Sequence, residues 1–168
     1  PTLAGDTLRK RAAASYQFYV ADIQQAAFAY AHPFRRLGVV TFGIQHMDYG
    51  KFDGYDATGM PRAQFNASET ALVIGKSRQI DNFRFGANVK YVSSAIDVYR
   101  SGAFLADLGG LFIHPTKKIT IGLAIKNFGV RLSPEVATRN VPFDVQAGVT
   151  FKPEHMPVRF SITGYNLA

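Results

Sequence analysis

Six charged residues are the side chains best placed to do chemistry in this 168-residue chain. Each stands beside apolar residues in a predicted strand, so all six should project from the face opposite the aliphatic one. Charges of both signs on one face can pair across neighbouring strands or hold a polar ligand. The candidates are Arg84, Lys90, Asp107, Lys126, Asp144 and Arg159.

Motifs for catalysis or for cofactor binding are not found. Gly75-Lys76-Ser77 resembles the end of a phosphate-binding loop, but Thr70 stands where that loop needs its first glycine. The surrounding residues also alternate like a strand. There is no nucleophile elbow, zinc-binding helix or dinucleotide fingerprint. We therefore predict a non-enzymatic protein without catalytic residues or a cofactor.

Two groups of residues have metal-ligating side chains. His32, His114 and His155 lie beside proline-containing turns, and Asp48, Asp53 and Asp56 lie in or beside a glycine-rich stretch whose spacing fits no EF-hand loop. The chain has no cysteine, which excludes thiolate ligands and disulfides. We expect turn histidines, solvated aspartates and no metal site.

The elements that position these residues are predicted to be β-strands. Apolar residues alternate with small or polar ones, as at Ile119, Ile121, Leu123 and Ile125, and the prolines fall between strands or at a strand start. No segment has a convincing helical period. The predicted strands, about nine in number, cover residues 13–20, 23–32, 37–48, 66–77, 83–97, 101–114, 118–131, 141–152 and 157–168.

The connections between strands differ in length at the two ends of the predicted sheet. Four are short, at 32–37, 78–82, 114–117 and 152–157, and two at the opposite end are longer, at 49–65 and 132–141. In an up-and-down meander, alternate connections lie at opposite ends. Outer-membrane barrels have this asymmetry, with short periplasmic turns and longer external loops.

The aliphatic face could meet lipid outside a membrane barrel or fill the core of a soluble, lipocalin-type barrel. Lipid is favoured because the polar face is mostly small residues, aromatic residues gather at strand ends, and the chain has only three glutamates. We predict an all-β, antiparallel up-and-down transmembrane β-barrel, residues 1–168 forming one domain. The predicted lipid-facing residues are Ile121, Leu123, Val145, Val149, Phe160 and Ile162.

The net charge of +7 would suit nucleic acid or a membrane. The basic pairs Arg35-Arg36 and Lys117-Lys118 lie in turns between apolar strands, where anionic lipid headgroups would attract them. We therefore predict contact with outer-membrane lipid and lipopolysaccharide, and no nucleic acid.

Glycines in the predicted strands indicate irregular or crowded places. Gly109-Gly110 predicts a bulge in the strand at 101–114, which is apolar on both faces around Asp107. Gly43, Gly86, Gly122 and Gly148 should all lie on the inward face. Repeated glycine there predicts close approach by another backbone. We expect a plugged lumen, filled by a segment preceding Pro1.

Several segments, in order along the chain, resemble the PorQ family of the type IX secretion system, a group of FadL-like and PorV-like outer-membrane proteins. They are 19–23, 28–31, 49–56, 64–69, 86–90, 106–109, 125–129 and 142–148, with Pro1–Leu3 similar to the end of an Asn-Pro-Ala-Leu segment. Thr2 replaces the alanine of that segment, and the preceding asparagine is not in the chain.

This resemblance implies the middle of a larger, roughly 14-stranded FadL-like barrel in the outer membrane of a Bacteroidetes-type bacterium. It implies a non-enzymatic role in protein transport, through contacts with other type IX components and with cargo that carries a sorting domain. The alternative implied by the wider FadL likeness is passive transport of hydrophobic small molecules. No binding residue carries over.

Overall fold

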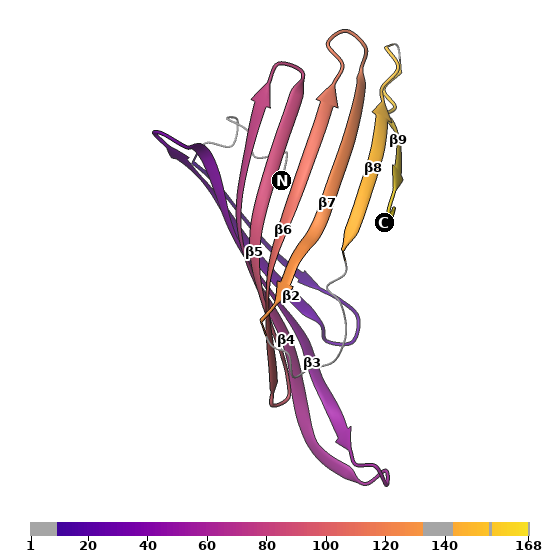
Figure 1. Cartoon of the computed structure of the whole chain (residues 1–168). Helices are drawn as coiled ribbons and strands as arrows, with labels where there is room; N and C mark the ends of the chain where they lie inside the picture. The colour runs from indigo at the N-terminus through magenta and orange to yellow at the C-terminus, as the bar shows by residue number, and fades with distance from the viewer. Residues whose placement is uncertain (1–9, 133–142, 155, 168) are drawn as a thin grey trace.

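Alternating side chains give this chain a single antiparallel β-sheet, which the computed structural model describes for residues 10–132, 143–154 and 156–167. Nine strands of this part pair in chain order as an up-and-down meander (Figure 1). They are β1 (Arg11–Phe18), β2 (Gln24–Phe34), β3 (Gly38–Tyr55), β4 (Pro61–Ile80), β5 (Phe83–Ile96), β6 (Tyr99–Ile113), β7 (Ile119–Arg131), β8 (Asp144–Phe151) and β9 (Phe160–Gly164). The predicted all-β class, strand number and topology are confirmed.

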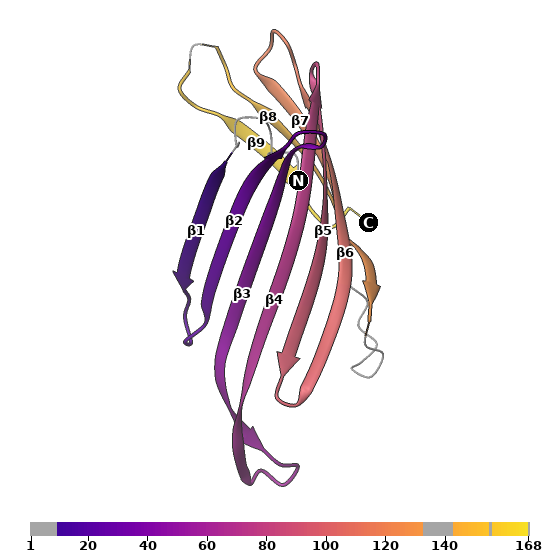
Figure 2. The ribbon, with the colours of Figure 1, turned by 90° about the vertical axis from the view of Figure 1, so that its left-hand side faces the viewer.

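The sheet is twisted and curved, and it is not closed within the described residues (Figures 1 and 2). β1 and β9 are its two edges, each with one neighbour. No helix in the described part of the chain is long and apolar enough to cross a membrane.

Short turns at several strand ends use residues that tolerate a left-handed backbone. Asp81 and Asp97 begin the two-residue connections β4–β5 and β5–β6, and their φ angles are 50° and 53°. Aspartate adopts this conformation more readily than most residues because its short side chain can hydrogen-bond locally. These turns fix the register of the strands on either side.

The long loop predicted at residues 49–65 is wrong. β3 and β4 continue as paired strands to Tyr55 and Pro61, and this hairpin projects beyond the other strands (Figure 2). Register shifts between Asp48 and Lys51 and between Phe52 and Gly54 absorb the turn-forming residues as bulges. The stacked rings of Phe52 and Phe65, 5.5 Å apart, join the two strands beyond the first bulge.

The two faces of the sheet have different chemistry. The apolar face carries residues such as Ile74, Val89, Leu108, Ile121 and Phe128, which share a face by cross-strand register. The polar face carries the residues between them, including Thr41, Gly75, Asn88, Asp107 and Thr120.

Exposure is distributed in an unusual way between these faces. Most large side chains of the apolar face are exposed, for example Leu123 at 53% and Val89 at 58%. The polar face is mostly half-buried, and four of the five buried hydrophobic residues, Ala31, Val39, Ala67 and Leu105, lie on it. Among the described residues, no side chain is fully buried.

Candidate functional site

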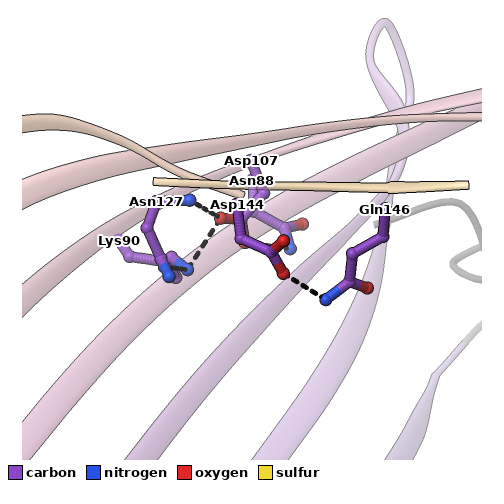
Figure 3. A network of polar contacts seen from close by, with 6 residues as sticks. All are labelled: Asn88, Lys90, Asp107, Asn127, Asp144 and Gln146. Atoms are coloured by element: carbon purple, nitrogen blue, oxygen red, sulfur yellow. Dashed lines mark hydrogen bonds and ion pairs between the residues drawn. The ribbon is translucent and has the colours of Figure 1, made fainter. Parts of the chain in front are cut away.

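The most buried charge on the polar face is Asp107 in β6, which is 6% exposed. The antiparallel register places Asn88 of β5 directly opposite Asp107, with Lys90 one residue pair further along the same face. Lys90 Nζ lies 2.7 Å from Asp107 Oδ1, so the two form an ion pair (Figure 3). Two of the six charged candidates, Lys90 and Asp107, thus lie on the same face and interact across neighbouring strands.

Asn127 of β7 forms hydrogen bonds with both members of this ion pair. Its backbone N–H donates to Asp107 Oδ1 at 2.9 Å, and its side-chain Oδ1 accepts from Lys90 Nζ at 2.7 Å. Asn127 can do both because it has a φ of 57° and sits at a bulge between β6 and β7. The bulged residues Lys126 and Asn127 together face the single residue Asp107.

The bulge predicted at Gly109-Gly110 is therefore misplaced. Gly109 and Gly110 pair in regular register with Gly86 and Phe85 on one side and with Ala124 and Leu123 on the other. The irregularity lies on β7, because Asn127 adopts the left-handed conformation and Asp107 accepts its N–H.

Asn88 brings the second oxygen of the carboxylate into the network, with its Nδ2 lying 3.5 Å from Asp107 Oδ2. The space for this side chain comes from Gly75 in β4. A Cβ at position 75 would lie 2.3 Å from Asn88 Oδ1 and 2.8 Å from Thr41 Oγ1. Gly75 therefore lets a polar amide pack flat against the strand.

A second polar group lies on β8. Asp144 accepts a short hydrogen bond from Gln146 Nε2 (Figure 3). It accepts another from the backbone N–H of Asn166 at 2.7 Å. The register places Lys126 of β7 opposite Asp144 on the same face. Lys126 and Asp144, two of the six charged candidates, are therefore register partners on the polar face.

The two arginine candidates lie away from this network. Arg84 is on the polar face of β5, nearer the β4–β5 turn, and its Nη2 donates to Gln79 Oε1 at 2.7 Å. Arg159 precedes β9, which begins at Phe160, so the prediction of a strand position for Arg159 is wrong. The connection from β8 is longer than its sequence indicated, and β9 spans five residues.

The six predicted lipid-facing residues all lie on the apolar face. Cross-strand pairs join Ile121 to Val149 and Val149 to Ile162, and Ile162 is 81% exposed. Val145 is half-buried, while the other five are exposed. Contact of these residues with lipid stays a prediction.

The aspartates considered as metal ligands have structural partners. Asp48 accepts from the N–H of Gly50, Asp53 from the side chain of Gln64, and Asp56 from Thr58 and Met60. Among the described residues, no group of three histidine or acidic side chains could hold a metal ion. His155 lies outside the described residues.

A hollow of about 440 Å³ lies over β1–β4 and opens on the polar face. Its lining is mostly apolar and includes Ala13, Ala29, Gly43 and Val73, together with the polar residues Thr41 and Asn88. It places an apolar space beside polar groups whose hydrogen bonds are already made.

Sequence reasoning missed Asn88, Asn127 and Gly75 as members of the network. A signal for the bulge was present, because the apolar residues of this strand change parity, from odd positions up to Ile125 to even positions at Phe128 and Val130. For Gly75 and Asn88 no comparable signal exists, since their contact joins two strands.

Comparison of the chain with protein-family models, with curated proteins and with solved structures gave no match.

Proposed function

We propose that this sheet is part of a transmembrane β-barrel of the bacterial outer membrane. The observation that carries the proposal is the exposure of the apolar face, where Phe85, Leu108, Leu123 and Ile162 are each about half exposed or more. Exposed apolar surface of this extent is unfavourable in water and favourable in lipid. The crowded polar face would line the lumen.

Strand length and aromatic placement also support a membrane position. β5, β6 and β7 have 14, 15 and 13 residues, and a tilted strand needs about 9–11 to cross the hydrocarbon region. Rings gather at the short-turn end, where Phe83 and Phe112 lie 5.0 Å apart and His32 and Phe34 lie 4.7 Å apart. Aromatic residues favour the interface between hydrocarbon and headgroups.

Closure of the barrel requires partners for β1 and β9, whose outer edges are unpaired in the described sheet. Further strands, to a total of roughly 14, would supply them as in FadL-like barrels. In such a barrel the Lys90–Asp107–Asn127 network stiffens the wall from inside and has no catalytic task.

Within this class we propose a non-enzymatic component of type IX protein secretion and cargo attachment. The support is the resemblance of chain segments to the PorQ family together with the β3–β4 hairpin, which projects beyond the sheet and exposes Tyr55 and Met60. A projecting hairpin with exposed apolar side chains suits contact with another protein.

Two measurements test these proposals in order. Fractionation of cells should recover the protein in the outer membrane, and recovery in the soluble fraction would contradict the barrel. Deletion of the gene should then reduce surface display of sorting-domain cargo, with other secretion components co-purifying with the protein. Normal display without such partners would contradict the secretion role.

Passive transport of hydrophobic small molecules is the second candidate, because the 440 Å³ hollow on the polar face has mainly apolar walls. Its volume lies within the range of ligand sites, about 300–1,000 Å³. Detergent or lipid held inside the purified barrel, and reduced uptake of hydrophobic compounds in a deletion strain, would favour it over secretion.

A further inference from the structure

The apolar face has a groove across β4–β7 with two basic residues on one side. Its volume is about 600 Å³, and the residues that line it include Lys76, Arg78, Phe85, Leu108, Gly110 and Leu123. All six lie on the apolar face by register: Arg78 is opposite Phe85, Phe85 opposite Gly110, and Gly110 opposite Leu123.

Gly110 gives this groove its depth. A Cβ at position 110 would lie 3.9 Å from Phe85 Cδ1, in ordinary van der Waals contact, so glycine leaves to the groove a space that a side chain could occupy. Phe85, Leu108 and Leu123 are each exposed by about half. Their side chains make apolar walls for an occupant that is itself apolar along its length.

Lys76 and Arg78 are exposed cations on a face that is otherwise apolar at this place. Neither forms an ion pair with a described residue. Arg78 is two residues and Lys76 four residues from Ile80, the last residue of β4, or roughly 7 and 13 Å along the strand. Long basic side chains at such depths extend toward the membrane surface while their stems stay in apolar surroundings.

We propose that this groove binds one anionic phospholipid, with an acyl chain along Phe85, Leu108 and Leu123 and the phosphate between Lys76 and Arg78. The inference rests on the proposed membrane position. Short turns mark the periplasmic end of bacterial barrels, so the basic residues would lie in the periplasmic leaflet, where phospholipid is available. Guanidinium and ammonium groups together suit a phosphate because both donate charge-assisted hydrogen bonds.

The test uses the full-length protein folded into bilayer nanodiscs of phosphatidylglycerol and phosphatidylcholine with identical acyl chains. Native mass spectrometry then counts the lipids that stay bound after release. We expect phosphatidylglycerol to be retained in preference, by roughly fivefold for each basic side chain that contacts the phosphate.

Three variants assign the preference to the groove. Lys76→Gln/Arg78→Gln should abolish it, whereas Lys117→Gln/Lys118→Gln, the same charge change in the β6–β7 turn at the same end, should leave it intact. Gly110→Leu should reduce retention of both lipids by filling the groove. The single variant Arg78→Gln should lower the preference in part, which keeps the test available if the double variant folds poorly.

Heat-modifiable migration of each variant is measured first, because it separates a failure to fold into the bilayer from a failure to bind lipid. A wild-type protein that never folds into bilayers would overturn both the membrane position and the lipid site. A folded barrel without lipid preference, or with equal losses in the two double variants, would overturn the lipid site alone. Preferred retention of lipid A over phosphatidylglycerol in a matched mixture would also overturn it.

Discussion

At the scale of single residues, Asp107 owes its burial to the groups around it. A carboxylate that is 6% exposed needs compensation, and Lys90 and the N–H of Asn127 both lie within hydrogen-bonding distance. Removing one partner of a buried ion pair costs more than the pair itself contributes, because the remaining charge stays buried.

Lys90→Ala should therefore lower the free energy of unfolding by about 3 kcal/mol. Urea titration of the protein folded in lipid vesicles, followed by heat-modifiable migration, measures the change. The double variant Lys90→Met/Asp107→Leu should recover much of the loss because it leaves no unpaired charge. Equal destabilisation in the single and double variants would show that Lys90 acts through packing alone.

Asp56, at the turn of the β3–β4 hairpin, is a second carboxylate that accepts hydrogen bonds from its neighbours. The Thr58 hydroxyl donates to Asp56 Oδ1 at 2.6 Å, and the N–H groups of Met60 and Thr58 each donate at 2.9 Å. These bonds, the hydroxyl first, lower the pKa of Asp56 below its ordinary value of 3.8. The ionised carboxylate is therefore the form that holds the turn.

The stability that Asp56 lends to the turn should be complete above the unfolded pKa and lost as the pH falls through the lower folded pKa. Measured relative to amides elsewhere in the protein, hydrogen exchange at the Thr58 and Met60 amides should become faster below about pH 3.8. Asp56→Asn should remove this pH dependence. An unchanged pH profile in that variant would contradict the assignment to Asp56.

At the scale of elements, the strands and their order followed from alternation, proline positions and short turns. The sequence also placed five of the six charged candidates on the polar face, because a strand with period two assigns each residue to one side. The error at 49–65 has a physical reason. Glycine and aspartate serve in bulges as well as in turns, and only cross-strand contacts such as Phe52 with Phe65 distinguish the two.

The β6–β7 bulge depends on close backbone approach at Gly129. A Cβ there would lie 2.0 Å from Phe104 O and 2.8 Å from Leu105 Cα, so the backbone itself must move. Gly129→Ala should destabilise the sheet by roughly 1–3 kcal/mol. Gly110→Ala is the matched control and should have little effect, since its Cβ would be in ordinary contact with Phe85. Equal urea midpoints for both variants would contradict the proposed crowding.

At the scale of the whole molecule, one open sheet has to satisfy two environments. Local pattern could assign the two faces but not their surroundings, because a soluble barrel and a membrane barrel share the same period of two. The exposures favour the membrane interpretation, since the large apolar side chains are the exposed ones and the polar face is mostly half-buried. Closure of the sheet depends on what pairs with the outer edges of β1 and β9. The pattern of residues within a strand carries no information about that pairing.

Replacing Leu123 with arginine tests which face meets lipid. Leu123 is 53% exposed on the apolar face of β7, and an arginine near the bilayer midplane costs about 2–4 kcal/mol. We expect Leu123→Arg to reduce the yield of heat-modifiable barrel folded into vesicles. Gln146→Arg is the control, because Gln146 lies on the polar face of β8 beside Asp144 and should accept a cation. Normal folding of Leu123→Arg together with failure of Gln146→Arg would mean that the polar face meets lipid.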